Sequence, residues 1–321
     1  MIRFLRIAAV SLAAAVSAPV MAQDFPLTIE HKFGTTVIAD KPERIASVDY
    51  GGADNLLALG IQPVTIRYWY GDYPRGVWPW ADDFLEGEPA LLQGDLDFEA
   101  IAATDPDVII ALYSGITDKD YEALSRIAPV VAVPEGVGDY ALAWDELAIT
   151  VGRAVGEAAA AQEQVDAIRA RLADIAAEHP EWAGKSAAIG NVWLDTPGAY
   201  TSRDVRQRIL EAMGFVTPPA IDALAQEDDF YVDLSPEDLS PIDADVTLWF
   251  FDETLDPIHD LTAWRFMAST QEGRDAYLGP LLTGAFSHAS LLSLPYTIGR
   301  LEPILEAALD GDPQTHADDR P

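Results

Sequence analysis

The sequence predicts an α/β fold: two Rossmann-like lobes with parallel sheets, joined by a single long rigid α-helix, with a ligand cleft between the lobes. One observation is an internal repeat, in which residues 96–113 and 234–251 both place a glutamate at a short helix start, then an aspartate, then an apolar run ending on an aromatic residue. Another is the alternation of apolar runs with helical stretches, which is typical of parallel sheets. A third is the uninterrupted helical stretch 157–178. Paired lobes imply a cleft where small ligands bind.

Residues 1–22 have the pattern of a cleaved export signal. Arg3 and Arg6 give a charged start, residues 7–16 are apolar, and small residues precede Gln23. A membrane anchor is the alternative, but the apolar stretch is shorter than the ~20 residues that a spanning helix needs. The chain contains no cysteine, the residue through which a mature N-terminus would be lipid-anchored. We therefore expect a soluble periplasmic protein without a lipid anchor.

Residues 23–155 are predicted to form the N-terminal α/β lobe. It begins with a hairpin over residues 25–38, followed by a short strand at 45–48 and a helix at 53–59 that Gly60 ends. A second strand follows at 61–66, and the repeat adds a buried strand at 108–113.

Residues 156–179 are predicted to connect the lobes as one helix. The apolar positions Val165, Ile168, Leu172 and Ile175 are three or four residues apart and make a single stripe. At ~1.5 Å per residue the stretch 157–178 makes a rod of roughly 33 Å, which joins the lobes stiffly.

Residues 180–310 are predicted to form the C-terminal α/β lobe. Its first strand is expected at 186–193, followed by a loop to residue 203 and a helix at 205–213. The polar segment 311–321 is predicted to be a disordered tail.

The chain is strongly acidic. Its formal charge is −33, and removal of Arg3 and Arg6 with the signal makes it −35. Such a surface repels nucleic acid and anionic lipid, so neither is an expected partner, and solubility alone is sufficient to explain it. We expect a monomer.

The stretch from Tyr68 to Phe84 is the densest in aromatic residues, and its prolines and glycines predict a loop after the second strand. Loops at the carboxyl ends of strands face the ligand crevice of α/β sheets. Trp69, Tyr70 and Trp78 are therefore candidate ligand contacts, because such rings offer large stacking areas. The alternative is that many of these rings only pack the loop onto its lobe.

Other strand ends supply further candidates. Arg67 could pair with an anionic ligand group through its planar fork, or could form an ordinary surface ion pair. His288 is a candidate that could equally be a satisfied polar residue. The remaining candidates also follow predicted strands; they are Tyr50, Tyr113, Trp193, Tyr200, Arg203, Trp249 and Phe251.

The twin glutamates Glu99 and Glu237 follow expected N-caps, Asp97 and Ser235. They could simply complement a helix dipole. A matching carboxylate in each lobe would instead make a two-point docking device for a partner with arginines.

The chain resembles the substrate-binding proteins of ABC importers for iron–siderophore complexes and vitamin B12, over nearly the whole mature sequence. The segments that carry the resemblance are Lys41-Pro42-Glu43-Arg44-Ile45, Leu57-Ala58-Leu59-Gly60-Ile61-Gln62-Pro63-Val64, Phe98-Glu99-Ala100-Ile101, Asp105-Pro106-Asp107-Val108-Ile109-Ile110, Trp144 to Gly156 and Leu291 to Gly311.

The resemblance implies that ligand is held between the lobes with little closure and is delivered to permease subunits in the inner membrane, whose arginines receive Glu99 and Glu237. Ferric siderophore is the first expectation, with the iron held by the chelate and no cofactor or protein-bound metal. Some hydroxamate binders of this kind use an arginine where this chain has Gln93. This departure counts against hydroxamate specificity and would leave chelate contacts to Arg67 or Arg203. The charge of −35 gives no long-range attraction for a triply anionic ferric catecholate, which favours a neutral or weakly charged chelate.

Several alternatives remain open. Vitamin B12 or haem could be the ligand. A zinc or manganese binder would need converging histidines and carboxylates, but the five histidines are scattered. A hydrolase is not supported, because the chain has neither Gly-x-Ser-x-Gly nor His-Glu-x-x-His, so we predict no catalytic residues and no enzyme. A sensor that reports ligand occupancy to a membrane receptor is a further possibility.

Overall fold

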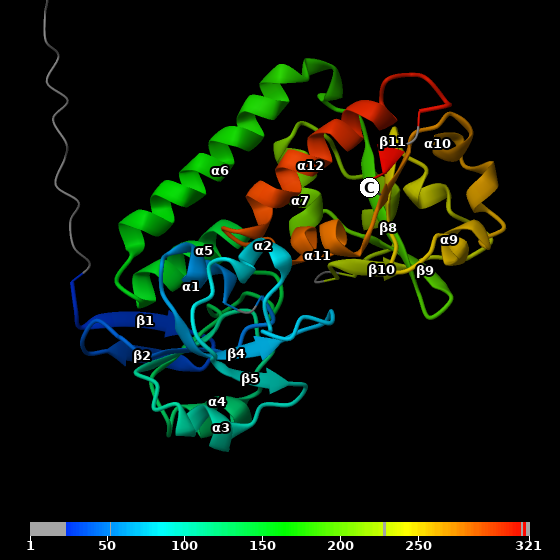
Figure 1. The fold of residues 1–321 in the computed structure, drawn as a ribbon. Helices are drawn as coiled ribbons and strands as arrows, with labels where there is room; N and C mark the ends of the chain where they lie inside the picture. The colour runs from blue at the N-terminus through cyan, green and yellow to red at the C-terminus, as the bar shows by residue number, and fades with distance from the viewer. Residues whose placement is uncertain (1–23, 52, 227–228, 316, 319–321) are drawn as a thin grey trace, which may run out of the picture.

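The computed structural model describes residues 24–318, apart from residues 52, 227–228 and 316. The predicted export signal, residues 1–22, lies outside them. Two lobes, each built around its own sheet, are joined by the long helix α6 (Ala158–Glu178) (Figure 1). The predicted fold class is confirmed, with one difference in the second sheet.

The N-terminal lobe contains a sheet in which all neighbouring strands are parallel, in the order β5-β4-β3-β6-β7. Its strands are β3 (Ile45–Ser47), β4 (Pro63–Tyr68), β5 (Ala90–Gln93), β6 (Val108–Ala111) and β7 (Val130–Ala132). The predicted N-terminal hairpin is present as β1 (Leu27–His31) and β2 (Gly34–Ile38). The helices of this lobe are α1 (Asp54–Ala58), α2 (Pro79–Asp82), α3 (Phe98–Ala103), α4 (Asp118–Leu124) and α5 (Trp144–Ala154).

Helices cover both faces of this sheet. Ile45 and Ile110 pack on one face with Val151 of α5, whereas Ala46 and Ile109 pack on the other with residues of α3 and α4. Burial on both sides explains why these strands read as continuous apolar runs in the sequence.

The C-terminal lobe contains a mixed sheet in the order β10-β9-β8-β11-β12-β13. The strands are β8 (Ala187–Trp193), β9 (Thr196–Tyr200), β10 (Tyr231–Asp233), β11 (Val246–Phe250), β12 (Asp275–Leu278) and β13 (Ala317–Asp318). The α-helices are α7 (Val205–Ala212), α8 (Pro219–Asp222), α9 (Asp256–His259), α10 (Ala268–Gln271), α11 (Pro280–His288) and α12 (Ser293–Ala308). Short 3₁₀ turns lie at η1 (Pro180–Trp182), η2 (Ser240–Ile242) and η3 (Trp264–Phe266).

Two sequence-based expectations for this lobe are wrong. Residues 193–203 are not a plain loop, because β8 and β9 form an antiparallel hairpin whose two turn residues, Leu194 and Asp195, both have positive φ. The segment 311–321 is not disordered throughout, because β13 pairs with β12 at the sheet edge and Ala317 is buried. A two-residue strand flanked by polar residues is too short to produce a pattern in the sequence.

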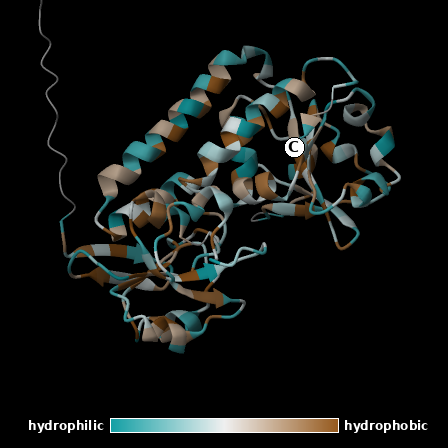
Figure 2. Ribbon diagram, in the orientation of Figure 1, coloured by the Kyte–Doolittle hydropathy of each residue, from teal (hydrophilic) through white to brown (hydrophobic). Residues whose placement is uncertain are grey.

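Helix α6 contacts both lobes. The predicted stripe Val165, Ile168, Leu172 and Ile175 is buried, and hydrophilic and hydrophobic bands alternate along the helix (Figure 2). Gln164 Nε2 donates to the carbonyl of Ala58 in the N-terminal lobe at 2.9 Å. Arg171 forms an ion pair with Glu302 of α12 in the other lobe.

The lobes also contact each other directly. Ser290 Oγ, just before α12, donates to Asp54 Oδ2 of α1 at 2.7 Å, and the indole of Trp80 donates to the same oxygen at 2.7 Å. The backbone N–H of Leu291 donates to Asn55 Oδ1 at 2.9 Å. Since Asp54 and Ser290 are buried, these hydrogen bonds are shielded from water.

The aromatic loop that follows β4 forms a second interlobe contact. Trp78 and Trp80 stack with ring centroids 4.9 Å apart and are buried against Ala285 of α11. The backbone of Gly284 lies so close to Trp78 that a Cβ at this position would be 2.4 Å from Cζ3 of the indole. Trp78 and Trp80 therefore hold the two lobes in contact, and we call these two residues the interlobe wedge.

The internal repeat has a structural explanation in the aspartates that precede β6 and β11. In the first lobe, Asp107 Oδ2 accepts hydrogen bonds from the backbone N–H groups of Glu43 (2.9 Å) and Arg44 (2.8 Å), just before β3. The Arg44 guanidinium in turn donates to the carbonyls of Thr104 and Asp105. These bonds fix the entry of β3 beside that of β6.

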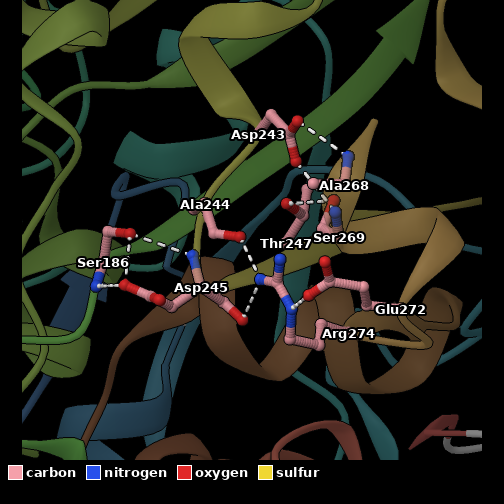
Figure 3. Close-up of polar contacts among 9 residues, drawn as sticks. All are labelled: Ser186, Asp243, Ala244, Asp245, Thr247, Ala268, Ser269, Glu272 and Arg274. Atoms are coloured by element: carbon pink, nitrogen blue, oxygen red, sulfur yellow. Dashed lines mark hydrogen bonds and ion pairs between the residues drawn. The ribbon is translucent and has the colours of Figure 1, made fainter. Parts of the chain in front are cut away.

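The second lobe repeats this arrangement with different partners (Figure 3). Asp245 Oδ2 accepts from the N–H (2.7 Å) and the hydroxyl (2.8 Å) of Ser186, just before β8. Arg274 Nη1 donates to the carbonyls of Ala244 and Asp245. The repeated aspartate therefore serves strand registration in both lobes.

The repeated glutamates differ in their local structure. Glu99 lies in the first turn of α3, where Asp97 accepts from the N–H of Ala100 at 2.9 Å. Glu237 lies in a tight turn closed by a bridge between Ser235 and Asp238, so the predicted helix start there is wrong. A helix beginning at that point would need an N–H at position 241, which is proline. Both glutamates are exposed.

Candidate functional site

The strand order of the first lobe brings Tyr50 and Tyr113 together. In this order the chain leaves β3 and β6 in opposite directions, and the crevice at their carboxyl ends is where α/β proteins bind ligands. The N–H of Tyr50 donates to the carbonyl of Tyr113 at 2.9 Å, and the N–H of Tyr113 donates to Asp49 Oδ1 at 2.7 Å.

A cleft of about 730 Å³ lies between this edge and the corresponding edge of the second lobe. That volume is in the range of small-molecule sites. Most of its walls are aromatic. The first lobe contributes Tyr50, Trp69, Tyr113 and Tyr140, and the second contributes Asn191, Trp193, Leu194, Thr196, Tyr200, Arg206, Phe230, Tyr231 and Asp233.

Trp193 and Leu194 form a strongly exposed part of the wall. Trp193 is 68% and Leu194 is 83% exposed, at the tip of the β8–β9 hairpin. Trp69, on the opposite lobe, is 37% exposed. Exposed rings on two sides of one cleft offer stacking surfaces for a ligand with an apolar exterior.

Arg67 lies behind this wall instead of lining it. Its guanidinium stacks on the ring of Tyr50 at 4.0 Å and donates to the hydroxyl of that residue at 3.0 Å. It also donates to the carbonyls of Ser114 (2.9 Å) and Gly94 (3.2 Å). Arg67, on β4, therefore positions Tyr50 and connects the loops that follow β3, β5 and β6.

Arg206, which the sequence analysis did not single out, is the cation among the described residues that line the cleft. Asp204 binds it at two points, with Nε–Oδ1 and Nη2–Oδ2 distances of 2.7 Å, and both residues are buried. Arg206 also stacks on Tyr200 at 3.8 Å and donates to Ser287 Oγ at 3.0 Å. Burial alone would lower the pKa of Arg206, but the Asp204 carboxylate raises it, so the side chain stays charged.

Four tyrosines of the cleft, Tyr113, Tyr140, Tyr200 and Tyr231, stay protonated at neutral pH. Burial raises the pKa of Tyr113 to about 12 and also raises the pKa values of Tyr140, Tyr200 and Tyr231. Their hydroxyl groups are therefore neutral donors and acceptors, and that of Tyr231 donates to Asn191 Oδ1 at 2.6 Å.

Several predicted ligand contacts lie elsewhere. Trp249 is completely buried, because its indole packs against Gly190 of the neighbouring strand, so its expected place in the cleft is wrong. Phe251 packs in the same core cluster. Arg203 is exposed and does not line the cleft. Trp78 is 5% exposed and belongs to the interlobe wedge.

His288 and Tyr70 lie behind Trp69. The imidazole is surrounded by aromatic rings and its Nδ1 hydrogen-bonds to the carbonyl of Gly284 at 2.8 Å. Burial lowers the pKa of His288, although nearby Asp54 opposes the change. Tyr70 contacts Trp69 edge-on, with ring centroids 4.8 Å apart, so both residues support the cleft wall from behind.

Some cleft residues were not predicted, because their sequence context does not distinguish them from ordinary surface or loop residues. Arg206 follows Asp204 in the first turn of a helix, a spacing that permits an ion pair but is common on protein surfaces. Phe230 and Tyr231 come just before and at the start of the short strand β10, which was not predicted. Tyr140 lies in a loop, and its place opposite Tyr113 depends on the fold (ring centroids 5.2 Å apart).

Among the described residues, no three histidine, aspartate or glutamate side chains lie together in a way that could hold a metal ion. The zinc or manganese alternative therefore gains no support from this part of the chain. In the same residues, no helix is long and apolar enough to span a membrane.

Two α/β lobes held by one long helix, with a ligand-sized cleft at their junction, define a two-lobed ligand-binding protein. Residues 45–256 match the family described as periplasmic binding protein, and the chain belongs to this family. The family resemblance noted in the sequence is thereby confirmed.

Relatives and solved structures agree with this assignment. The chain is 29% identical over 232 residues to a probable siderophore-binding lipoprotein of Bacillus subtilis, YfiY, covering 70% of this chain and 68% of that protein. It is 26% identical over 211 residues to the Fe(3+) dicitrate-binding periplasmic protein FecB of Escherichia coli, covering 63% and 66%. Its fold is similar to that of Streptococcus pneumoniae PiaA in complex with ferrichrome, with a TM-score of 0.77 and 30% identity over 89% of this chain and 99% of that one.

Proposed function

We propose that this protein captures a ferric siderophore in the interlobe cleft and delivers it to the permease of an ABC importer, acting as a carrier without catalysis. The observation that carries the proposal is the aromatic cleft of about 730 Å³ at the facing sheet edges. Relatives described as siderophore-binding and Fe(3+) dicitrate-binding support it. The ligand brings its own chelating oxygens, so the cleft needs walls that fit the chelate and no metal ligands of its own.

Titration with ferric siderophores, followed through tryptophan fluorescence, tests this proposal. Trp69 and Trp193 line the cleft and are exposed, so their emission should change when a chelate enters. We expect sub-micromolar to micromolar binding of one chelate class and much weaker binding of free ferric ion. Vitamin B12 and haem belong in the same titration. If calorimetry shows binding of B12 or haem and of no siderophore, the assignment is wrong.

Glu99 and Glu237 are proposed to dock the loaded protein on the permease. Both are exposed, one on each lobe, and neither lines the cleft. Glu99→Ala combined with Glu237→Ala should lower transport and leave chelate affinity intact. The matched control is Glu122→Ala with Glu253→Ala, which also removes one exposed carboxylate from each lobe. Equal transport by the two double variants would contradict the docking role.

The site of action is proposed to be the periplasm, reached through the export signal at residues 1–22. Mass determination of the protein recovered from that compartment tests this directly. The expected mass is that of a chain beginning at Gln23 with no lipid attached.

A further inference from the structure

The cleft wall carries few charged side chains, and its net charge is small. Of the described residues that line it, two carry formal charges: Arg206 and Asp233. Arg206 is already held at two points by Asp204, which is buried beside it. Because that pair is neutral as a unit, the remaining net charge is the carboxylate of Asp233, and it is negative.

Arg67, which lies behind the wall, has its guanidinium engaged by the protein: it donates to the Tyr50 hydroxyl and to the carbonyls of Ser114 and Gly94. Its guanidinium lies against the ring of Tyr50, which separates it from the cleft. The protein beyond the cleft is strongly acidic, with a formal charge of −33 for the whole chain.

The remaining polar side chains that line the cleft are neutral. They include the hydroxyls of Tyr113, Tyr140 and Tyr200 and the amide of Asn191. Such groups can hydrogen-bond the oxygens of a chelate without requiring it to be charged. The rings of Trp69 and Trp193 add surfaces that suit an apolar exterior.

We propose that the cleft selects a ferric chelate of zero net charge, such as a trihydroxamate, and discriminates against polyanionic chelates such as tricatecholates and citrate complexes. This inference rests on the proposed function and specifies its ligand class. A trianionic chelate would lose its hydration on entering the cleft, meet no unpaired cation and be repelled by Asp233.

Calorimetric titration with three probes tests the selectivity: ferrichrome as the neutral trihydroxamate, a ferric tricatecholate, and ferric dicitrate. We expect ferrichrome to bind at least roughly 100-fold more tightly than either anion, because binding an ion without a counter-charge is unfavourable. Raising the NaCl concentration should leave ferrichrome affinity unchanged and strengthen tricatecholate binding, because salt screens the repulsion.

Removing one carboxylate tests the electrostatic cause. Asp233→Asn should raise tricatecholate affinity by roughly three- to tenfold, so the preference for ferrichrome over the tricatecholate should narrow. Asp195→Asn is the matched control, since Asp195 lies at the exposed tip of the same sheet, outside the cleft lining, and asparagine accepts its positive φ. Asp233 is exposed, so its substitution leaves the buried core unchanged.

The outcomes separate this inference from the proposed function. If none of the three ferric probes binds, the proposed function itself fails. Should the tricatecholate or ferric dicitrate bind as tightly as ferrichrome, the protein is still a siderophore carrier and the charge selectivity is wrong. An equal effect of Asp233→Asn and Asp195→Asn would also overturn it, because the selectivity would then arise from the overall charge of the protein.

Discussion

Adding one methyl group at Gly284 tests whether the aromatic loop wedges the lobes together. A Cβ at this position would lie 2.4 Å from Cζ3 and 2.5 Å from Cη2 of Trp78. The indole has little room to yield, because it is 5% exposed and stacked on Trp80. Overpacking of this kind costs about 1–3 kcal/mol. Contacts of 2.4 and 2.5 Å with a buried ring place this site in the upper part of that range, about 2–3 kcal/mol, and alanine in a helix interior recovers about 1 kcal/mol relative to glycine. We therefore expect a net loss of about 1–2 kcal/mol in the free energy of unfolding.

Gly299 of α12 provides the matched control. It is exposed, and a Cβ there would meet no atom within 4 Å. Gly299→Ala should therefore stabilise the protein by up to about 1 kcal/mol through helix propensity alone. The same chemical change is thus expected to have opposite signs at the two positions.

Urea unfolding followed by far-ultraviolet circular dichroism measures both variants without relying on tryptophan emission. A double-mutant cycle that combines Gly284→Ala with Trp78→Phe tests whether the loss of stability comes from the clash with Trp78. Phenylalanine lacks the two atoms that the new methyl group would contact. Gly284→Ala should cost less in that background. If Gly284→Ala is as stable as the unmodified protein, or if its cost is unchanged beside phenylalanine, the wedge interpretation is refuted.

Three further predictions concern the cleft and its surroundings. Burial raises the pKa of Asp49 from 3.8 to about 7, so the folded protein holds a proton that the unfolded chain has lost, and the free energy of unfolding should fall as pH rises from about 4 to 7. Asp49→Asn should reduce this fall by at most about 4 kcal/mol in urea titrations at several pH values; an unchanged profile would show that Asp49 is ionised throughout. Arg206→Met should cost about 3–5 kcal/mol because it leaves Asp204 buried without a partner, and adding Asp204→Asn should recover part of that loss in the same unfolding assay. Trp193→Ala should change stability by less than about 0.5 kcal/mol, since the ring is exposed, but should weaken binding of a siderophore that the protein captures by roughly tenfold in calorimetry.

Elements defined by continuous apolar runs could be predicted from the sequence. The parallel strands β3 and β6 and the stripe along α6 follow from local periodicity, which the structure retains. The hairpin β8–β9 could not be predicted, because its turn uses Leu194 and Asp195 at positive φ instead of the asparagine and glycine that usually signal such turns.

The candidate site was harder to predict than the fold. Trp249 and Trp193 both occur near strand ends, but only the register between β8 and β11 shows that Trp249 fills the space above Gly190. Arg203 and Arg206 lie within four residues of each other, and which of them faces the cleft is set by the start of α7 after Asp204. Such distinctions depend on the packing of distant segments, about which a local pattern carries no information.

The buried indoles between the lobes make it energetically costly to release a ligand by separating the lobes. Separating the halves would expose part of Trp78 and Trp80 to water, and at about 25 cal/mol per Å² over at most some 150–250 Å² each this costs at most about 10 kcal/mol. Spontaneous separation of the lobes is therefore unfavourable in the protein on its own. A partner protein that separates the lobes must supply that work, so the energy for releasing the ligand comes from outside this polypeptide.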